Sequence, residues 1–105
     1  MVISSFFPGR IRIRDKVFRD SEISQSLRAA IEWHDAIKKI EHNLTTGSVL
    51  IEYAPEKLPV SALSALSGEL LSLKKLCDRY NLREDETLRS QILGKIAELK
   101  EKLVA

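Results

Sequence analysis

Three side chains in the sequence could bind a metal ion: His34, His42 and Cys77. Imidazole nitrogens and a thiolate are good ligands for zinc or copper when the fold brings them to one point. These three residues are at no recognised ligand spacing, and His42 falls where a strand would normally place an apolar residue. We therefore expect no metal site, with His42 partly buried and hydrogen-bonded and His34 exposed.

Catalysis would need a nucleophile, a base and an orienting group close together. Cys77 lies on the apolar stripe of an expected helix, which predicts a buried and inert thiol. The four glycines are scattered and form no phosphate-binding loop. The acidic run Glu84-Asp85-Glu86 is typical of a helix start. The sequence therefore predicts a protein that is not an enzyme and has no cofactor.

A row of arginines is the clearest candidate for a binding surface. Arg10, Arg12 and Arg14 alternate with isoleucines, so a strand would place the arginines on one face and Ile11 and Ile13 on the other. The basic residues that we predict to contact a partner are Arg10, Arg12, Arg14, Lys16 and Arg19.

Three interpretations of this row remain open. It could be a solvated strand face, a nucleic-acid surface, or a docking surface for a protein partner. Nucleic-acid binding by a sheet needs stacking aromatics beside the charges. Tyr53 shares the apolar face, and only Phe6 and Phe7 could flank the strand. Charges on an edge strand also discourage indiscriminate pairing, and the segment "VISSFF" could add a strand or cover that edge.

Composition limits the remaining classes. The chain has 105 residues, of which 44% are hydrophobic and 30% charged, values that exclude a disordered tail or a membrane span. The net charge is only +2, so the total charge gives nucleic-acid binding no support. A single cysteine suits a reducing cytoplasm, and "MVISSFFPGR" lacks the features of a signal peptide. We expect a cytoplasmic protein with a single domain, residues 1–105.

The first half alternates strand and helix signals. Period-two alternation from Arg10 to Phe18, with Val17 also facing the core, predicts a strand, and Asp20-Ser21 can cap a helix that reaches about Trp33. "AIKKIEHN" predicts a second strand. "VLIEYAP" predicts a third, with Val49, Ile51 and Tyr53 on one face. The turn "TTGS" between them contains Gly47, which can adopt positive φ. Residues 1–55 therefore predict a βαββ unit.

Residues 56–105 show helical periodicity and predict an antiparallel helical hairpin. Pro59 suits the first turn of the first helix, Gly68 could break it, and Asn81 could end it. A helix is favoured over a strand for Leu70–Leu76, which lacks β-branched residues. Small residues form a second face that suits packing within the monomer or a homodimer seam: Ser61, Ala65, Gly68 and Ser72. The apolar stripes are Leu63, Leu66, Leu70, Leu73, Leu76 and Cys77, then Leu88, Ile92, Ile96, Leu99 and Leu103.

Together, "PGRIRIR", Ile37 at the start of the second strand and the hairpin "NLTTGSVLIEY" resemble the heavy-metal-associated domain superfamily. The resemblance spans Phe7 to Ala54 and implies a ferredoxin-like βαββ core within an α+β fold. Metal-carrying members have Cys-x-x-Cys in the loop after the first strand. Here that loop reads "DKVFRDSEIS" and has neither cysteine nor histidine. The chain therefore resembles a divergent branch, found in bacteria beside cation-transporting P-type ATPases, that lacks the metal motif.

The sequence thus favours a non-catalytic interaction or regulatory module. Its partner would be another protein or a second copy bound through the helical hairpin, and the resemblance implies a link to a cation-transporting P-type ATPase without membrane insertion. The alternative is a nucleic-acid-binding ferredoxin-like domain that uses the strand of Arg10, Arg12 and Arg14.

Overall fold

The structure is a computed structural model that describes the backbone of residues 2–58 and 60–104 and the side chains of residues 5, 7–58 and 68–102. Strands and helices alternate in the first half, and two long helices make up most of the second. The elements are β1 (Val2–Phe7), β2 (Arg10–Arg14), the 3-10 helix η1 (Lys16–Arg19), α1 (Ser21–Ile31), β3 (Ile37–Asn43), β4 (Ser48–Tyr53), the 3-10 helix η2 (Pro55–Lys57), α2 (Val60–Leu82) and α3 (Glu86–Val104).

The four strands form one antiparallel sheet in the order β1-β2-β4-β3. Since β4 lies between β2 and β3, the unit β2-α1-β3-β4 has the predicted ferredoxin-like βαββ arrangement. The fourth strand is β1, which pairs with the outer edge of β2. The prediction that "VISSFF" could add a strand is confirmed. The preference for a helix at Leu70–Leu76 is also confirmed, because this segment lies within α2.

The turn between β1 and β2 depends on Pro8 and Gly9. Gly9 has φ +89°, a conformation that side chains with a Cβ rarely adopt. The two-residue turn pairs Phe7 with Arg10 across the hairpin. The carbonyl of Gly9 also accepts a hydrogen bond from Tyr53 N at 2.9 Å. This turn therefore fixes β1 in register against the rest of the sheet.

The first predicted strand is shorter than its alternating pattern indicated. β2 ends at Arg14, and Val17 and Phe18 lie in η1. Both side chains are nonetheless almost fully buried, with 2% and 1% of their surface exposed. A 3-10 turn can direct adjacent residues into the core, whereas a strand would send them to opposite faces. The inference that Val17 is a core residue is confirmed, but the strand that was expected to carry it is not present there.

Helix α1 begins at the predicted cap. The Asp20 carboxylate accepts hydrogen bonds from Glu22 N at 3.0 Å and Ile23 N at 3.2 Å, which satisfies amides that have no partner within the helix. The same carboxylate accepts a bond from Arg89 Nε of α3 at 3.0 Å. The helix ends at Ile31, slightly before the expected end at Trp33. Its N-terminus is therefore fixed to the helical hairpin.

The predicted hairpin of α2 and α3 is confirmed, and α2 continues through Gly68 without a break. Leu73 and Cys77 face the core from α2. Leu70 was expected on this stripe but is 40% exposed, because the helical rotation carries it past the edge of the buried face. The buried residues of α3 are Leu88, Ile92, Ile96 and Leu99. The predicted side-chain positions outside the described residues are Phe6, Pro59, Ser61, Leu63, Ala65, Leu66 and Leu103.

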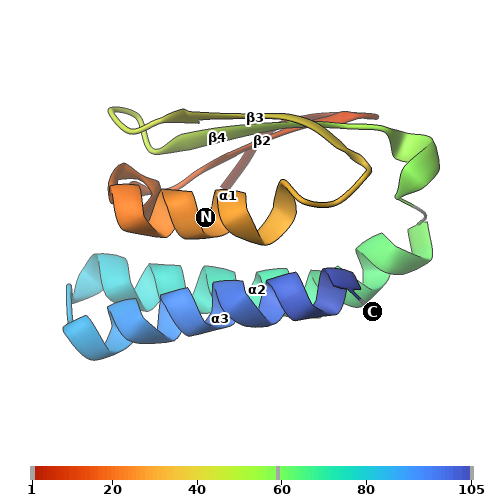
Figure 1. The fold of residues 1–105 in the computed structure, drawn as a ribbon. Helices are drawn as coiled ribbons and strands as arrows, with labels where there is room; N and C mark the ends of the chain where they lie inside the picture. Colours follow the sequence, from red (N-terminus) through yellow and green to blue (C-terminus); the bar gives the residue numbers. More distant parts are fainter. Residues whose placement is uncertain (1, 59, 105) are drawn as a thin grey trace.

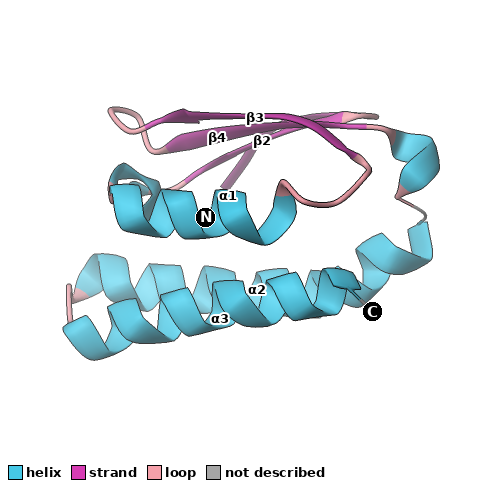
Figure 2. Cartoon of the chain, viewed as in Figure 1, coloured by secondary structure: helices cyan, strands magenta, loops and turns pink. Residues whose placement is uncertain are grey.

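All three α-helices lie on one side of the sheet (Figure 1). Helix α1 lies between the sheet and the helical hairpin, and α2 and α3 run side by side beneath it (Figure 2). One continuous apolar cluster joins these layers, from Val49 of β4 through Leu27 of α1 to Ile92 of α3. The opposite face of the sheet is left without a helix. Neither α2 nor α3 has, in its described part, an apolar stretch suited to crossing a bilayer.

Candidate functional site

The face of the sheet that points away from the helices, here called the open face, is built from cross-strand rows. Residues paired across neighbouring strands present their side chains on the same face. Arg10, Arg12 and Arg14 are all exposed on this face. The three rows that run from β2 through β4 to β3 are Arg10-Glu52-Lys39, Arg12-Leu50-Glu41 and Arg14-Ser48-Asn43.

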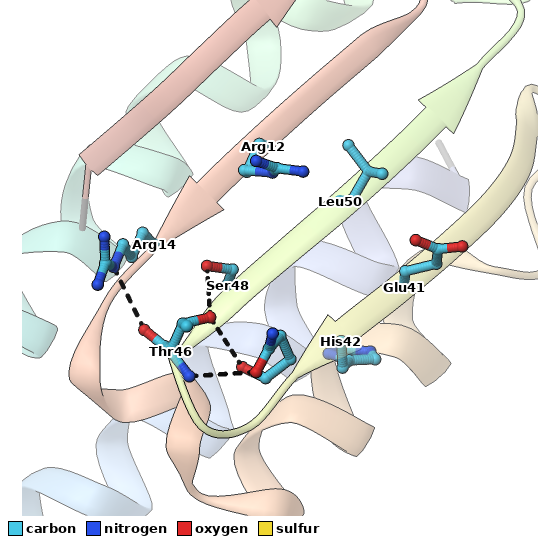
Figure 3. A pocket seen from close by; sticks show the side chains of 8 residues that line it. Arg12, Arg14, Glu41, His42, Thr46, Ser48 and Leu50 are labelled. Atoms are coloured by element: carbon cyan, nitrogen blue, oxygen red, sulfur yellow. Dashed lines mark hydrogen bonds between the residues drawn. The ribbon is translucent and has the colours of Figure 1, made fainter.

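A shallow hollow of about 500 Å³ lies on the open face along β4 (Figure 3). Arg12 and Arg14 of β2 form one side, and Glu41 of β3 stands on the other. Leu50 lies between them on β4 and is only 8% exposed, because its long neighbours cover it with their aliphatic stems. The remaining residues around the hollow are His42, Asn43, Thr46 and Ser48.

Hydrogen bonds at the β3–β4 turn hold the end of this hollow. Arg14 Nε donates to the Thr46 carbonyl at 3.3 Å, and Thr46 N donates to Asn43 Oδ1 at 3.2 Å. The Thr46 hydroxyl donates to Ser48 Oγ at 2.9 Å (Figure 3). One guanidinium N–H of Arg14 is therefore used to orient its side chain toward the turn. A guanidinium has five such donors, so others remain for a ligand.

The far side of the hollow carries its own ion pair. Lys39 Nζ lies 2.6 Å from Glu41 Oε1, and both side chains are about half exposed. The hydrogen bond from Lys39 lowers the pKa of Glu41, and the charges of Arg10 and Arg12 lower it further. The Glu41 carboxylate raises the pKa of Lys39 in turn. The open face therefore combines a positively charged strand, β2, with a strand, β3, whose opposite charges are paired.

The five predicted partner-binding residues fall into two groups. Arg10, Arg12 and Arg14 line β2, while Lys16 and Arg19 are exposed on η1 beyond the end of that strand. Within the described residues, no carboxylate lies in ion-pair contact with Arg10, Arg14, Lys16 or Arg19. The structure brings these five cations to one side and one end of the sheet. Their role in binding stays a prediction.

Phe7 is a residue of this face that the sequence placed only loosely. It pairs with Arg10 across the β1–β2 hairpin and is 62% exposed. The expectation that Phe7 could flank the arginine strand is therefore confirmed. The Pro8-Gly9 turn was the available signal, since a two-residue turn forces the residues on either side to pair.

The histidines and the cysteine are not brought together. Among the described residues, no group of three His, Cys, Asp or Glu side chains could hold a metal ion. His34 was expected to be exposed, but it is partly buried, and its Nδ1 accepts a hydrogen bond from Ala36 N at 3.0 Å. His42 is partly buried, as expected, but neither ring nitrogen has a hydrogen-bond partner among the described residues. Cys77 is buried, as predicted, and burial raises its pKa to about 12.

The loop between β2 and α1 is filled with apolar side chains and internal hydrogen bonds. Val17 and Phe18 point into the core. Asp15 is 8% exposed, and its Oδ1 accepts hydrogen bonds from Val17 N at 3.0 Å and from the Asn81 amide at 2.8 Å. Burial raises the pKa of Asp15, but the hydrogen bonds that it accepts, including these two, hold the pKa below its ordinary value. The loop thus acts as part of the core.

The fold and this site define an α+β protein with a ferredoxin-like unit, a basic open sheet face and a helical hairpin. The profile of the family described as heavy metal associated domain 2 matches residues 1–103. The chain therefore belongs to the heavy metal associated domain 2 family. Searches of curated proteins and of solved structures gave no match.

Proposed function

We propose that this protein is a non-catalytic, single-domain interaction module that docks on a partner protein through the open face of its sheet. The observation that carries this proposal is the row of exposed arginines on β2, on the face that the helices leave uncovered. Opposite charges on two surfaces steer association and fix the register of a complex. A partner with an acidic surface would therefore be selected over a neutral one.

The loop between β2 and α1 supports an interaction role over metal carriage. A metal carrier must present ligands that exchange with a partner, and thiolates and imidazoles suit soft metals. In this chain the loop "DKVFRDSEIS" contains neither group, and Val17 and Phe18 occupy the core instead. Two cations within this loop, Lys16 and Arg19, extend the basic surface around that end of the molecule.

The partner that we propose is a cytoplasmic domain of a bacterial cation-transporting P-type ATPase. This choice rests on the resemblance of the βαββ unit to domains that accompany such transporters. The module would act in the cytoplasm beside the transporter, regulating it or recruiting it without entering the membrane.

Binding of the purified protein to the cytoplasmic domains of the cation-transporting P-type ATPase from the same organism tests this proposal. Replacing Arg10, Arg12 and Arg14 together by Ser should leave the circular dichroism spectrum unchanged and weaken binding at least tenfold, because each lost charge-assisted hydrogen bond is worth roughly 1.5–3 kcal/mol. A matched control replaces Arg79 and Arg83, exposed residues of the hairpin, by Ser. Equal loss in both variants, or no binding by the unchanged protein, would contradict the proposal.

Phe7 favours a second candidate function, binding of single-stranded nucleic acid. An exposed aromatic ring beside a guanidinium can stack on a base while the arginine contacts phosphate. Phe7 and Arg10 have this relation across the β1–β2 hairpin. Titration with a short oligothymidylate, using the protein and its Phe7→Ala variant, separates this function from protein docking.

Self-association through the helical hairpin is a third proposal. Leu71 is 54% exposed on α2, and Leu82 at its end is 90% exposed. Apolar side chains of this size at the surface often mark contacts with another chain. Light scattering at low and high salt should show a salt-resistant dimer if the hairpin forms an apolar interface, and a Leu71→Glu variant should then be monomeric.

A further inference from the structure

We propose that the open face binds an extended peptide with acidic residues at every second position. This inference rests on the proposed function and specifies the chemistry of the segment that the partner would present. The ligand would lie along β4, through the hollow beside Arg12 and Arg14 and onward to Arg10, with its carboxylates facing these three arginines. Its alternate side chains would face the opposite side of the hollow, formed by β3.

The spacing of the arginines carries the argument. Residues two apart on an antiparallel strand repeat every ~6.8 Å, so the three arginines form a ladder with that period. An extended peptide has the same repeat, and its side chains alternate between two sides. Acidic side chains at positions i, i+2 and i+4 would therefore meet successive arginines without strain. Consecutive acidic residues would send half of their carboxylates toward the other side.

The opposite side of the hollow determines which side chains suit the remaining, alternate positions of the peptide. Two strand spacings separate β2 from β3, which is about 9.5 Å, enough for one extended chain between their side chains. Glu41 is held there by Lys39, and Asn43 continues the row. Small polar side chains suit this side, because Glu41 would repel a second line of carboxylates. The Leu50 side chain and Ser48 form the floor between the two sides.

The edges of the sheet are less suited to an extended ligand than its face. The outer strands, β1 and β3, each contain an irregularity in register, between Ile3 and Ser5 and between Ile37 and Lys39. Irregularities and lysines on an edge strand hinder the addition of another strand. A peptide that uses its side chains on the open face avoids both obstacles.

The same face is poorly suited to a polyanion. Glu52 of β4 lies opposite Arg10, and Glu41 of β3 lies across Leu50 from Arg12, so a continuous phosphate backbone along the sheet would approach two carboxylates. Of the described residues on this face, Phe7 alone offers an exposed aromatic ring for base stacking. A peptide can place neutral side chains opposite the glutamates, whereas a nucleic acid carries a charge at every step.

Fluorescence anisotropy with two labelled peptides of about eight residues tests the inference. One peptide alternates Glu and Ser, and the other has the same composition with its Glu residues in one block. The alternating peptide should bind about tenfold more tightly at low salt, the gain expected when one more charge-assisted pair forms. Arg12→Ser and Arg12→Gln should each reduce that affinity, while Arg83→Ser, on an 83% exposed side chain of the hairpin, should not.

Charge exchange provides a second readout in the folded protein. An Arg12→Glu variant should lose affinity for the peptide that alternates Glu and Ser, and it should gain affinity for a peptide that alternates Lys and Ser. Equal affinities for the alternating and blocked peptides would overturn the inference, as would tighter binding of an oligothymidylate of similar length. If neither peptide binds but the ATPase domains bind in an arginine-dependent way, the inference fails and the proposed function stands.

Discussion

Gly47 shows how one residue can fix the relation between two loops. It has φ +71°, and a Cβ at this position would lie 2.3 Å from the carbonyl oxygen of Asp15. Its own carbonyl accepts a hydrogen bond from Asp15 N at 2.9 Å. The absence of a side chain therefore allows the β3–β4 turn to approach the loop that precedes η1. The sequence predicted the positive φ from the turn, but the close approach needs the tertiary fold.

We predict that Gly47→Ala strongly destabilises the protein. The substitution should cost at least the roughly 1–3 kcal/mol of a strained backbone position, because the new methyl group also collides with the Asp15 carbonyl. Urea denaturation followed by circular dichroism measures the change. The matched control is Gly94→Ala in α3, where an added Cβ would meet none of the described atoms within 4 Å beyond its chain neighbours and the local helix backbone. The free energy of unfolding of that variant should rise by about 0.8–1.0 kcal/mol because alanine has the higher helix propensity. A loss of stability in Gly94→Ala similar to that in Gly47→Ala would contradict this explanation.

His42 is the residue whose environment departs most from expectation. Its cross-strand partner is Val49, a core residue, so its ring points to the side of α1. Both ring nitrogens are buried, and no residue in the described part of the chain forms a hydrogen bond with them. Burial lowers the pKa of His42, the charge of Arg28 lowers it further, and Glu32 opposes the shift. The sequence placed this histidine at an apolar position, but the missing partners depend on how α1 crosses β3.

The lowered pKa of His42 predicts a loss of stability in mild acid. Since the folded pKa lies below the unfolded value of 6.5, the unfolded chain binds the proton more readily between these two values. The contribution of neutral His42 is complete above pH 6.5 and is lost as the pH falls through this window. His42→Leu should therefore reduce the difference between urea midpoints measured near about pH 7.5 and about pH 5.5. An unchanged difference would show that His42 is not the responsible group.

At the scale of elements, Arg89 links two parts of the fold that are far apart in sequence. Its side chain is 19% exposed, and its guanidinium lies 3.0 Å from Asp20 Oδ2 and 2.8 Å from Glu22 Oε2. It also lies 3.6 Å from Glu86 Oε1 on its own helix. One arginine of α3 thus holds the cap and the first turn of α1. Nothing in the local sequence pattern indicates this pairing, because the partners are 67 and 69 residues away.

We predict that Arg89→Ala destabilises the fold more than Arg89→Lys, because a lysine retains the charge but not the paired N–H donors. The hydrogen bond from Arg89 is the main cause of the lowered pKa of Asp20. This contribution is therefore complete above the unfolded pKa of 3.8 and is lost as the pH falls through the lower folded value. Acid unfolding of both variants and of the control Arg79→Ala would test it; equal acid sensitivity in all three would contradict the prediction.

The element predictions succeeded where one periodicity continued and failed where the backbone changed direction. Ile11 and Ile13, Val49 and Tyr53, and the stripe from Leu88 to Leu99 all face the core side as predicted. The alternation from Arg14 to Phe18 did not reveal η1, since a continued strand and a 3-10 helix would both bury Val17. The exposure of Leu70 could not be predicted either, because it depends on the rotation of α2 against α1 and α3. The arginine face followed directly from period two, while its hollow depends on Leu50, Glu41 and the turn.

At the scale of the whole molecule, the helical hairpin and the βαββ unit share one core. Ile92 and Ile96 of α3 belong to the same apolar cluster as Phe18 and Ile23. The exposed β2 arginines are therefore held on a sheet whose other face depends on both halves of the chain. This arrangement predicts that residues 1–105 unfold in one cooperative transition.

Two neighbouring leucines of α2 test this cooperativity. Leu73 is 2% exposed and Leu71 is 54% exposed. Leu73→Ala should cost roughly 2–5 kcal/mol, whereas Leu71→Ala should change stability by less than about 0.5 kcal/mol. In the Leu73 variant, the far-ultraviolet signal and the fluorescence of Trp33 should shift together during urea unfolding. Separate transitions for the two signals would show that the halves unfold independently.

The position of β1 has a consequence for how the chain matures during synthesis. The strand beside β2 comes from residues 2–7, and all strand pairings join residues between Val2 and Tyr53. Every backbone ladder of the sheet can therefore close before the ribosome has made the last helix. Helix α1 can cover this early sheet, but the side of α1 that packs against the hairpin stays uncovered until α2 and α3 emerge. The hairpin thus shields the first half of its own chain, and a pause in translation before α2 and α3 emerge from the ribosome would expose the future core to the cell.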